Sequence, residues 1–139
     1  MKSILVTGAC GLVGSDLVLA LQKKYGEENV IALDYQTACK SFQGIIEQAD
    51  VCDIDRLKNL IQKYDVGQIY HLAGLLSVGG EKNPDRAWAV NLGGLKNILD
   101  IARESQIKVF WPSSIAVYGE TTPKIDVPQH TSFEPTTIY

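Results

Sequence analysis

The sequence predicts an α/β fold built on a doubly wound parallel sheet with helices on both faces. Short apolar runs rich in β-branched residues alternate along the chain with segments whose apolar residues recur at helical spacing. The apolar runs are also nearly continuous, which fits strands buried on both faces of a parallel sheet.

The first strand is expected at residues 3–7, a short apolar run that ends at a glycine-rich interruption. A helix is expected at residues 12–25, because leucine and valine recur there at helical spacing and Gly26 can end it. The next apolar run, residues 30–34, ends on Asp34 and is expected to form the second strand.

The second half of the chain continues this alternation. Asp53 is a good N-cap for one helix, and Pro84 suits the first turn of a longer one. The segment after residue 112 contains three prolines and is expected to be a loop. The further elements are strands at 44–49, 68–73 and 107–112 and helices at 54–64 and 84–104. A complete fold of this type has six strands, so a sheet of five is expected to be incomplete at the C-terminus.

Composition excludes several classes of protein. The chain has 139 residues, 45% of them hydrophobic and 21% charged, which is typical of one globular domain and not of a disordered chain. The net charge of −3, without a basic tract, argues against nucleic-acid or membrane-surface binding. No apolar stretch is long enough to cross a bilayer, and no secretory signal precedes the first strand, so a cytoplasmic location is expected.

Three cysteines, at positions 10, 39 and 52, form no metal-type pair. Their odd number and spacing predict neither a disulfide framework nor a structural metal site. Three other side chains, His71, Trp88 and Trp111, are expected in the core rather than in a site.

The glycine-rich segment has the spacing of a phosphate-binding loop, with Gly8, Gly11 and Gly14 three residues apart. Gly8 would allow the tight turn out of the first strand, Gly11 would let a pyrophosphate approach the backbone, and Gly14 would let the helix pack closely. The free N–H groups at the start of the helix would face the phosphates.

Two acidic residues lie where a dinucleotide would need them. Asp34 follows Gly14 by twenty residues, and its carboxylate can accept both ribose hydroxyls of an adenosine. No arginine follows directly, so NAD is favoured over NADP. Asp50, with Val51, closes the third strand and can accept a hydrogen bond from the adenine amino group. Turn-forming or helix-initiating roles for the two aspartates remain the alternative.

The motifs together resemble the extended short-chain dehydrogenase/reductase family, also called the NAD-dependent epimerase/dehydratase family. They are Thr7–Gly14, Asp50-Val51, His71–Gly74, Asn91 and Ser113–Gly119. The resemblance implies a Rossmann-type NAD-binding domain over residues 1–139, in which Asn91 braces the neighbouring strand. The cofactor-binding residues are then Gly8, Gly11, Leu12, Val13, Gly14, Asp34, Asp50, Val51, Leu72, Ala73, Gly74, Leu75 and Asn91.

Within this family the sequence is most similar to the short-chain-type L-threonine 3-dehydrogenases, on segments that include Gly80–Pro84 and Phe110–Val117. That resemblance implies NAD-dependent oxidation of the threonine side-chain hydroxyl to 2-amino-3-oxobutanoate. Tyr139 would accept the proton and Ser114 would orient the hydroxyl. Ser77, expected on the loop after the fourth strand, would hold the substrate, although loop capping explains it equally well.

Two other functions stay open. One is a sugar-nucleotide epimerase or dehydratase, although Leu76 stands where those enzymes usually have a lysine. The other is a non-catalytic NAD-binding module. The family's lysine four residues after the tyrosine and its substrate domain would lie beyond Tyr139, so the isolated chain is expected to bind NAD weakly and turn over little. By analogy with the family, a homodimer is also expected.

Overall fold

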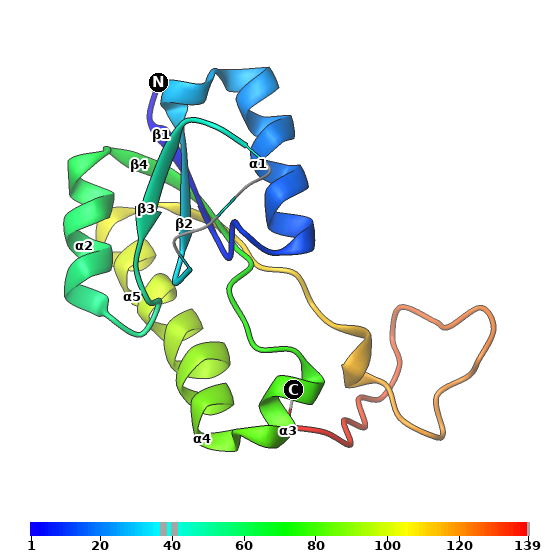
Figure 1. The fold of residues 1–139 in the computed structure, drawn as a ribbon. Helices are drawn as coiled ribbons and strands as arrows, with labels where there is room; N and C mark the ends of the chain where they lie inside the picture. Colours follow the sequence, from blue (N-terminus) through cyan, green and yellow to red (C-terminus); the bar gives the residue numbers. More distant parts are fainter. Residues whose placement is uncertain (37–38, 40–41, 139) are drawn as a thin grey trace.

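A computed structural model describes residues 1–36, 39 and 42–138. Five parallel strands form one sheet in the order β3-β2-β1-β4-β5, which confirms the predicted doubly wound α/β fold (Figure 1). The strands are β1 (Ser3–Thr7), β2 (Val30–Asp34), β3 (Ile45–Gln48), β4 (Val66–His71) and β5 (Lys108–Phe110).

Helices cover both faces of the sheet (Figure 1). On one face, α1 (Leu12–Tyr25) packs Val18 and Leu21 against Val6 of β1. On the other, α2 (Ile54–Lys63) and α5 (Leu95–Ser105) pack against Leu5. Neighbouring residues of β1 therefore serve opposite faces, and Leu5 and Val6 are both completely buried. This explains the continuous apolar pattern of the central strands.

The fourth strand begins and ends two residues earlier than its sequence pattern predicts. Asp65 turns the chain with a φ of 46°, and its carbonyl accepts a hydrogen bond from the Ser3 N–H at 3.1 Å. Pairing with β1 can therefore start at Val66. At the other end, the N–H groups of Leu72 and Ala73 bond to Thr7 and not to a continuing ladder.

The connection between β4 and β5 contains more separate helical segments than the sequence predicts. A short helix, α3 (Ser77–Lys82), replaces the predicted loop. The helix predicted from Pro84 is continuous but has three parts: α4 (Pro84–Ala87), a π-helical stretch η2 (Trp88–Gly94) and α5. Asn83 caps α4, because its Oδ1 accepts the Arg86 N–H at 3.1 Å.

The segment after β5 is mostly irregular, as predicted, and extends away from the sheet (Figure 1). Between residues 111 and 138 the regular structure is one 3₁₀ turn, η3 (Ile115–Val117). Another 3₁₀ turn, η1 (Glu27–Asn29), precedes β2. The prediction that both tryptophans lie in the core is wrong, since Trp88 is 58% exposed and Trp111 is 56% exposed. No helix in the described ranges is long and apolar enough to span a membrane.

The prediction of no disulfide is also wrong. Cys10 and Cys39 are joined, with their Cα atoms 4.9 Å apart, and Cys52 is free. Cys10 follows β1 and Cys39 follows β2, and these two strands pair in parallel, so their carboxyl ends lie at the same edge of the sheet. A sequence separation of 29 residues gives no local signal of that contact.

The disulfide should contribute measurably to stability because it closes a long loop in the unfolded chain. We expect Cys39→Ser to lower the free energy of unfolding by about 3 kcal/mol in non-reducing buffer. Urea denaturation of the variant and of the wild type, each with and without dithiothreitol, measures this. Reductant should lower wild-type and Cys52→Ser stability equally and leave Cys39→Ser unchanged. A wild-type urea midpoint that is the same with and without dithiothreitol would contradict the Cys10–Cys39 disulfide.

Candidate dinucleotide-binding site

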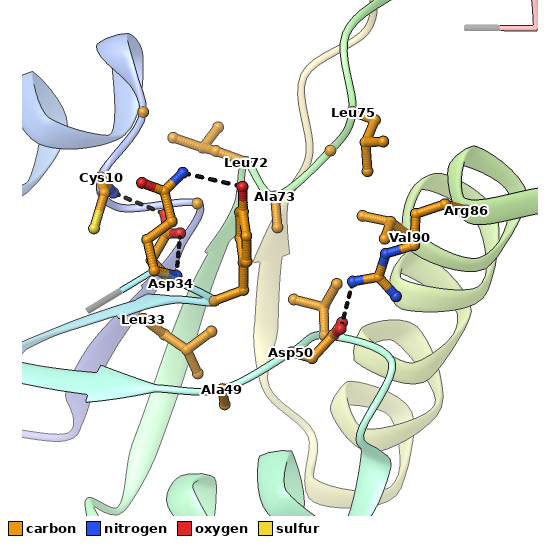
Figure 2. Close-up of a pocket in the computed structure, with 16 residues that line it drawn as sticks. Cys10, Leu33, Asp34, Ala49, Asp50, Leu72, Ala73, Leu75, Arg86 and Val90 are labelled. Carbon is orange, nitrogen blue, oxygen red and sulfur yellow. Dashed lines mark hydrogen bonds and ion pairs between the residues drawn. The ribbon is translucent and has the colours of Figure 1, made fainter. Parts of the chain in front are cut away.

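A cavity of about 500 Å³ opens at the carboxyl ends of the strands (Figure 2). It lies where the chain order reverses, because β1 pairs with β2 on one side and with β4 on the other. In open parallel sheets this is the place where ligands bind. The lining residues come from four strand ends: Gly8, Cys10 and Gly11; Leu33 to Gln36; Ala49 to Val51; Leu72 to Leu75; with Arg86 and Val90 from the helices.

The glycine loop at this cavity has no room for side chains at two positions. Gly8 has a φ of +69°, and a Cβ there would lie 2.7 Å from the backbone of Leu72 and Ala73. A Cβ on Gly14 would lie 2.1 Å from the Gly8 carbonyl oxygen. Gly11 lines the cavity directly. Gly14 thus allows α1 to pack against the turn, and Gly8 and Gly11 leave backbone without side chains at the cavity, as a bound pyrophosphate requires.

The start of α1 supplies hydrogen-bond donors beside this loop. The first backbone bond of the helix joins the Ser15 N–H to the Gly11 carbonyl at 2.9 Å, so the preceding N–H groups have no partner within the helix. These donors and the helix dipole favour an anion. The side chains of Leu12 and Val13 are 86% and 66% exposed and do not line the cavity, so their contribution is limited to the backbone.

Asp34 is fixed at the end of β2 and only 6% exposed. Its Oδ2 accepts the Cys10 N–H at 2.9 Å, and its Oδ1 accepts the Gln36 N–H at 3.1 Å. Each carboxylate oxygen keeps a further lone pair. The side chain is therefore held in one orientation at the cavity, as hydrogen bonding to ribose hydroxyls would need.

Asp50 lies on the opposite side of the cavity from Asp34 (Figure 2). Its Oδ1 accepts the Cys52 N–H at 2.9 Å, and its Oδ2 forms an ion pair with Arg86. Burial raises the pKa of Asp50, but the hydrogen bonds from Cys52 and Arg86 outweigh it and hold that pKa below its ordinary value. Asp50 is thus a carboxylate at neutral pH. Arg86 has no counterpart in the sequence predictions, because nothing in its local pattern separates it from a surface arginine.

A buried pair, Thr7 and His71, joins the ends of β1 and β4. The Thr7 Oγ1 lies 2.8 Å from His71 Nδ1 and accepts the N–H groups of Leu72 and Ala73, both at 3.2 Å. These two N–H groups use both acceptor sites of the hydroxyl oxygen, so the hydroxyl donates its proton to Nδ1. His71 is then a neutral imidazole that is protonated on Nε2. Burial lowers the pKa of His71 to about 4, which agrees with that state.

Asn91, on the π-helical stretch η2, holds the loop that follows β4. Its Oδ1 accepts the Leu75 N–H at 2.7 Å, and its Nδ2 donates to the Leu75 carbonyl at 3.0 Å. It therefore braces Leu75 beyond the strand and not the strand itself, and it does not line the cavity. Asn91 sets the position of a lining residue.

Neither Ser114 nor Ser77 is among the residues that line the cavity. Ser114 is the N-cap of η3, and its Oγ accepts the Ala116 N–H at 3.1 Å. Ser77 is the first residue of α3 and not a loop residue. Tyr139 lies outside the described residues. The residue before it donates its N–H to the Glu81 Oε1 at 2.9 Å, so the C-terminal segment lies against α3.

Comparisons with known proteins agree with this architecture. The model of the NAD dependent epimerase/dehydratase family matches residues 4–139. An uncharacterized epimerase/dehydratase from Staphylococcus aureus is 43% identical, over 100% of this chain and 44% of the relative. The solved structure of L-threonine dehydrogenase from Clostridium difficile is 47% identical with a TM-score of 0.92, over 99% of this chain and 44% of that chain.

A more distant structure, UDP-glucose-4-epimerase from Stenotrophomonas maltophila with bound NAD, is 26% identical with a TM-score of 0.84. This match covers 100% of the present chain and 44% of the epimerase. The chain thus spans less than half the length of each of these relatives.

The buried imidazole predicts an acid-sensitive fold. The unfolded chain takes up a proton on His71 below about pH 6.5, whereas the folded chain resists protonation down to about pH 4. This part of the stability is complete above pH 6.5 and is lost as the pH falls toward 4. Urea denaturation between pH 7.5 and 4.5 should show a smaller loss for His71→Asn than for the wild type. His130→Asn is the matched control, and an equal pH slope in all three proteins would refute the prediction.

Proposed function

Because this chain belongs to the NAD dependent epimerase/dehydratase family, we propose that residues 1–139 are the NAD-binding domain of an oxidoreductase. The observation that carries the proposal is the glycine cradle, Gly8 and Gly11, which lines the cavity without side chains at the switch point of the sheet. In this assignment the cradle and the start of α1 bind the pyrophosphate. Asp34 binds the adenosine ribose, and Asp50 with Val51 binds the adenine.

Leu72, Ala73, Gly74 and Leu75 form the remaining wall of the proposed cofactor site. Their backbone is positioned by Thr7 at one end and by Asn91 at the other. The cavity has a volume within the usual range for small-molecule sites, and apolar side chains alternate in it with fixed polar groups. The residues present therefore fit the cofactor.

We further propose that the substrate is L-threonine, oxidised at its side-chain hydroxyl to 2-amino-3-oxobutanoate. The support is the 47% identity to an L-threonine dehydrogenase, against 26% to a UDP-glucose-4-epimerase. Leu76, where sugar-nucleotide epimerases usually have a lysine, favours the same choice. An amino acid is thus the proposed small-molecule partner, and a homodimer in the cytoplasm is the proposed state of the protein.

NAD supplies the hydride acceptor when bound. The chain supplies groups that orient the alcohol and remove its proton. Ser114 Oγ uses a lone pair for the Ala116 N–H, so its own proton stays available to donate to the substrate hydroxyl oxygen. Tyr139, in its deprotonated phenolate form, is proposed to accept the proton of that hydroxyl and so become the neutral phenol. Ser77, at the start of the helix that contacts the C-terminal segment, is proposed to bind the substrate carboxylate or amine.

Removing the ribose carboxylate should weaken cofactor binding. In the full-length polypeptide that carries these residues, we expect Asp34→Ala to reduce NAD affinity by about 1.5–3 kcal/mol, the loss of hydrogen bonds to a charged group. Isothermal titration with NAD measures this. The exposed Asp55→Ala on α2 is the matched control. Unchanged affinity in Asp34→Ala would remove the ribose assignment.

Substrate assays should separate the competing reactions. The same polypeptide is mixed with NAD and either L-threonine or UDP-glucose, and NADH absorbance and sugar interconversion are followed. We expect threonine-dependent NADH formation that Ser114→Ala lowers by about 10²–10³-fold, the range for removing one hydrogen-bond donor to a reacting oxygen. Conversion of UDP-glucose without threonine oxidation would favour the epimerase. NAD binding with neither reaction would favour a non-catalytic module.

A further inference from the structure

The side of the cavity opposite Asp34 carries a charged pair and not an isolated carboxylate. Asp50 follows β3 and Arg86 lies on α4, and their side chains point toward one another at the cavity wall (Figure 2). Among the described lining residues, Arg86 is the one basic side chain. A positive and a negative group thus stand side by side where the proposed function places the adenine.

Neither group is saturated by its partner. Asp50 accepts one hydrogen bond on each oxygen, from Cys52 and from Arg86, and each carboxylate oxygen has a second acceptor site. Arg86 uses one N–H for Asp50 and another for Cys52 Sγ at 3.6 Å, which leaves further N–H groups of the guanidinium. The two side chains are 39% and 36% exposed, so a ligand can reach both.

Both groups are held in position before a ligand arrives. The backbone of Arg86 is fixed by the Asn83 cap of α4. The loop after Asp50 is fixed by Asn97 of α5, whose Nδ2 donates to the Val51 carbonyl at 3.0 Å and to the Cys52 carbonyl at 3.3 Å. The adjoining lining residues Ala49, Val51 and Val90 are apolar. A flat apolar ring with a polar edge fits such surroundings, whereas a phosphate would meet the Asp50 carboxylate.

We propose that Asp50 and Arg86 together recognise the edge of the adenine base of bound NAD. Asp50 accepts a hydrogen bond from the 6-amino group, and Arg86 donates one to the ring nitrogen beside it, N1 or N7. This inference rests on the proposed function, because it requires NAD in this cavity. Adenine presents an amino donor next to a ring-nitrogen acceptor on either edge, which complements a carboxylate beside a guanidinium. Arg86 is thus a specificity-determining residue for the cofactor.

Adenosine monophosphate and two analogues test the hydrogen bond from Arg86. 1-Deaza-AMP and 7-deaza-AMP each replace one ring nitrogen with C–H and keep the amino group. On the full-length polypeptide, we expect one of the two analogues to bind the wild type about tenfold more weakly than AMP. Arg86→Met should bind that analogue and AMP equally. Arg56→Met, which removes an arginine paired with Glu47 outside the cavity, should keep the wild-type difference.

The outcomes separate this inference from the proposed function. If the wild type binds NAD but binds both deaza analogues as tightly as AMP, the inference is wrong and NAD binding stands. If Arg86→Met weakens all three nucleotides by one factor and keeps the wild-type difference, Arg86 only positions Asp50, and the inference is again wrong. If the wild type binds neither NAD nor AMP, the proposed function fails as well. The wild-type comparison needs no variant, so equal binding of AMP and both analogues overturns the inference even if Arg86→Met folds poorly.

Discussion

The hydroxyl of Thr7 fixes the geometry on which the proposed site depends. One oxygen atom bonds to His71 and to two successive N–H groups after β4, so the ends of β1 and β4 are held at the same level. Gly8 must then turn while in contact with Leu72 and Ala73, where no side chain fits. The phosphate-binding backbone is therefore a consequence of how two central strands end, and the core beneath them holds that arrangement in place.

Elements with local signals were predictable from the sequence. The bounds of α1 and β2 agree with the prediction, because glycines stand before and after the helix and an acid, Asp34, ends the strand. The helix α3 has no sequence signal of its own, since Gly79 and Gly80 are poor helix formers. The early start of β4 depends on one residue with a positive φ, Asp65, which no apolar pattern reveals.

The site residues, too, were predictable only where they have a local sequence signal. The glycines, Asp34 and Asp50 belong to motifs that are contiguous in sequence and follow strands, so they could be named in advance. Arg86 reaches the cavity only because α4 lies over the loop after β3, 36 residues away in sequence. The link between Cys10 and Cys39 is likewise a contact between distant segments. Such pairs follow from tertiary structure, and neither Arg86 nor Cys39 differs locally from a surface residue.

The π-helical stretch η2 determines the rotational phase of the helix that follows it. Asn91, within η2, reaches the loop after β4, while Ile98 and Ile101 on α5 still face the sheet. A residue advances an α-helix by about 100° around its axis. Removing or adding one residue between Trp88 and Gly94 would therefore rotate the apolar stripe of α5 away from Ile69, or swing Asn91 off Leu75. The length of this stretch is consequently under a stricter constraint than its exposed side chains, Trp88 and Leu92, where substitutions should be tolerated although deletions are not.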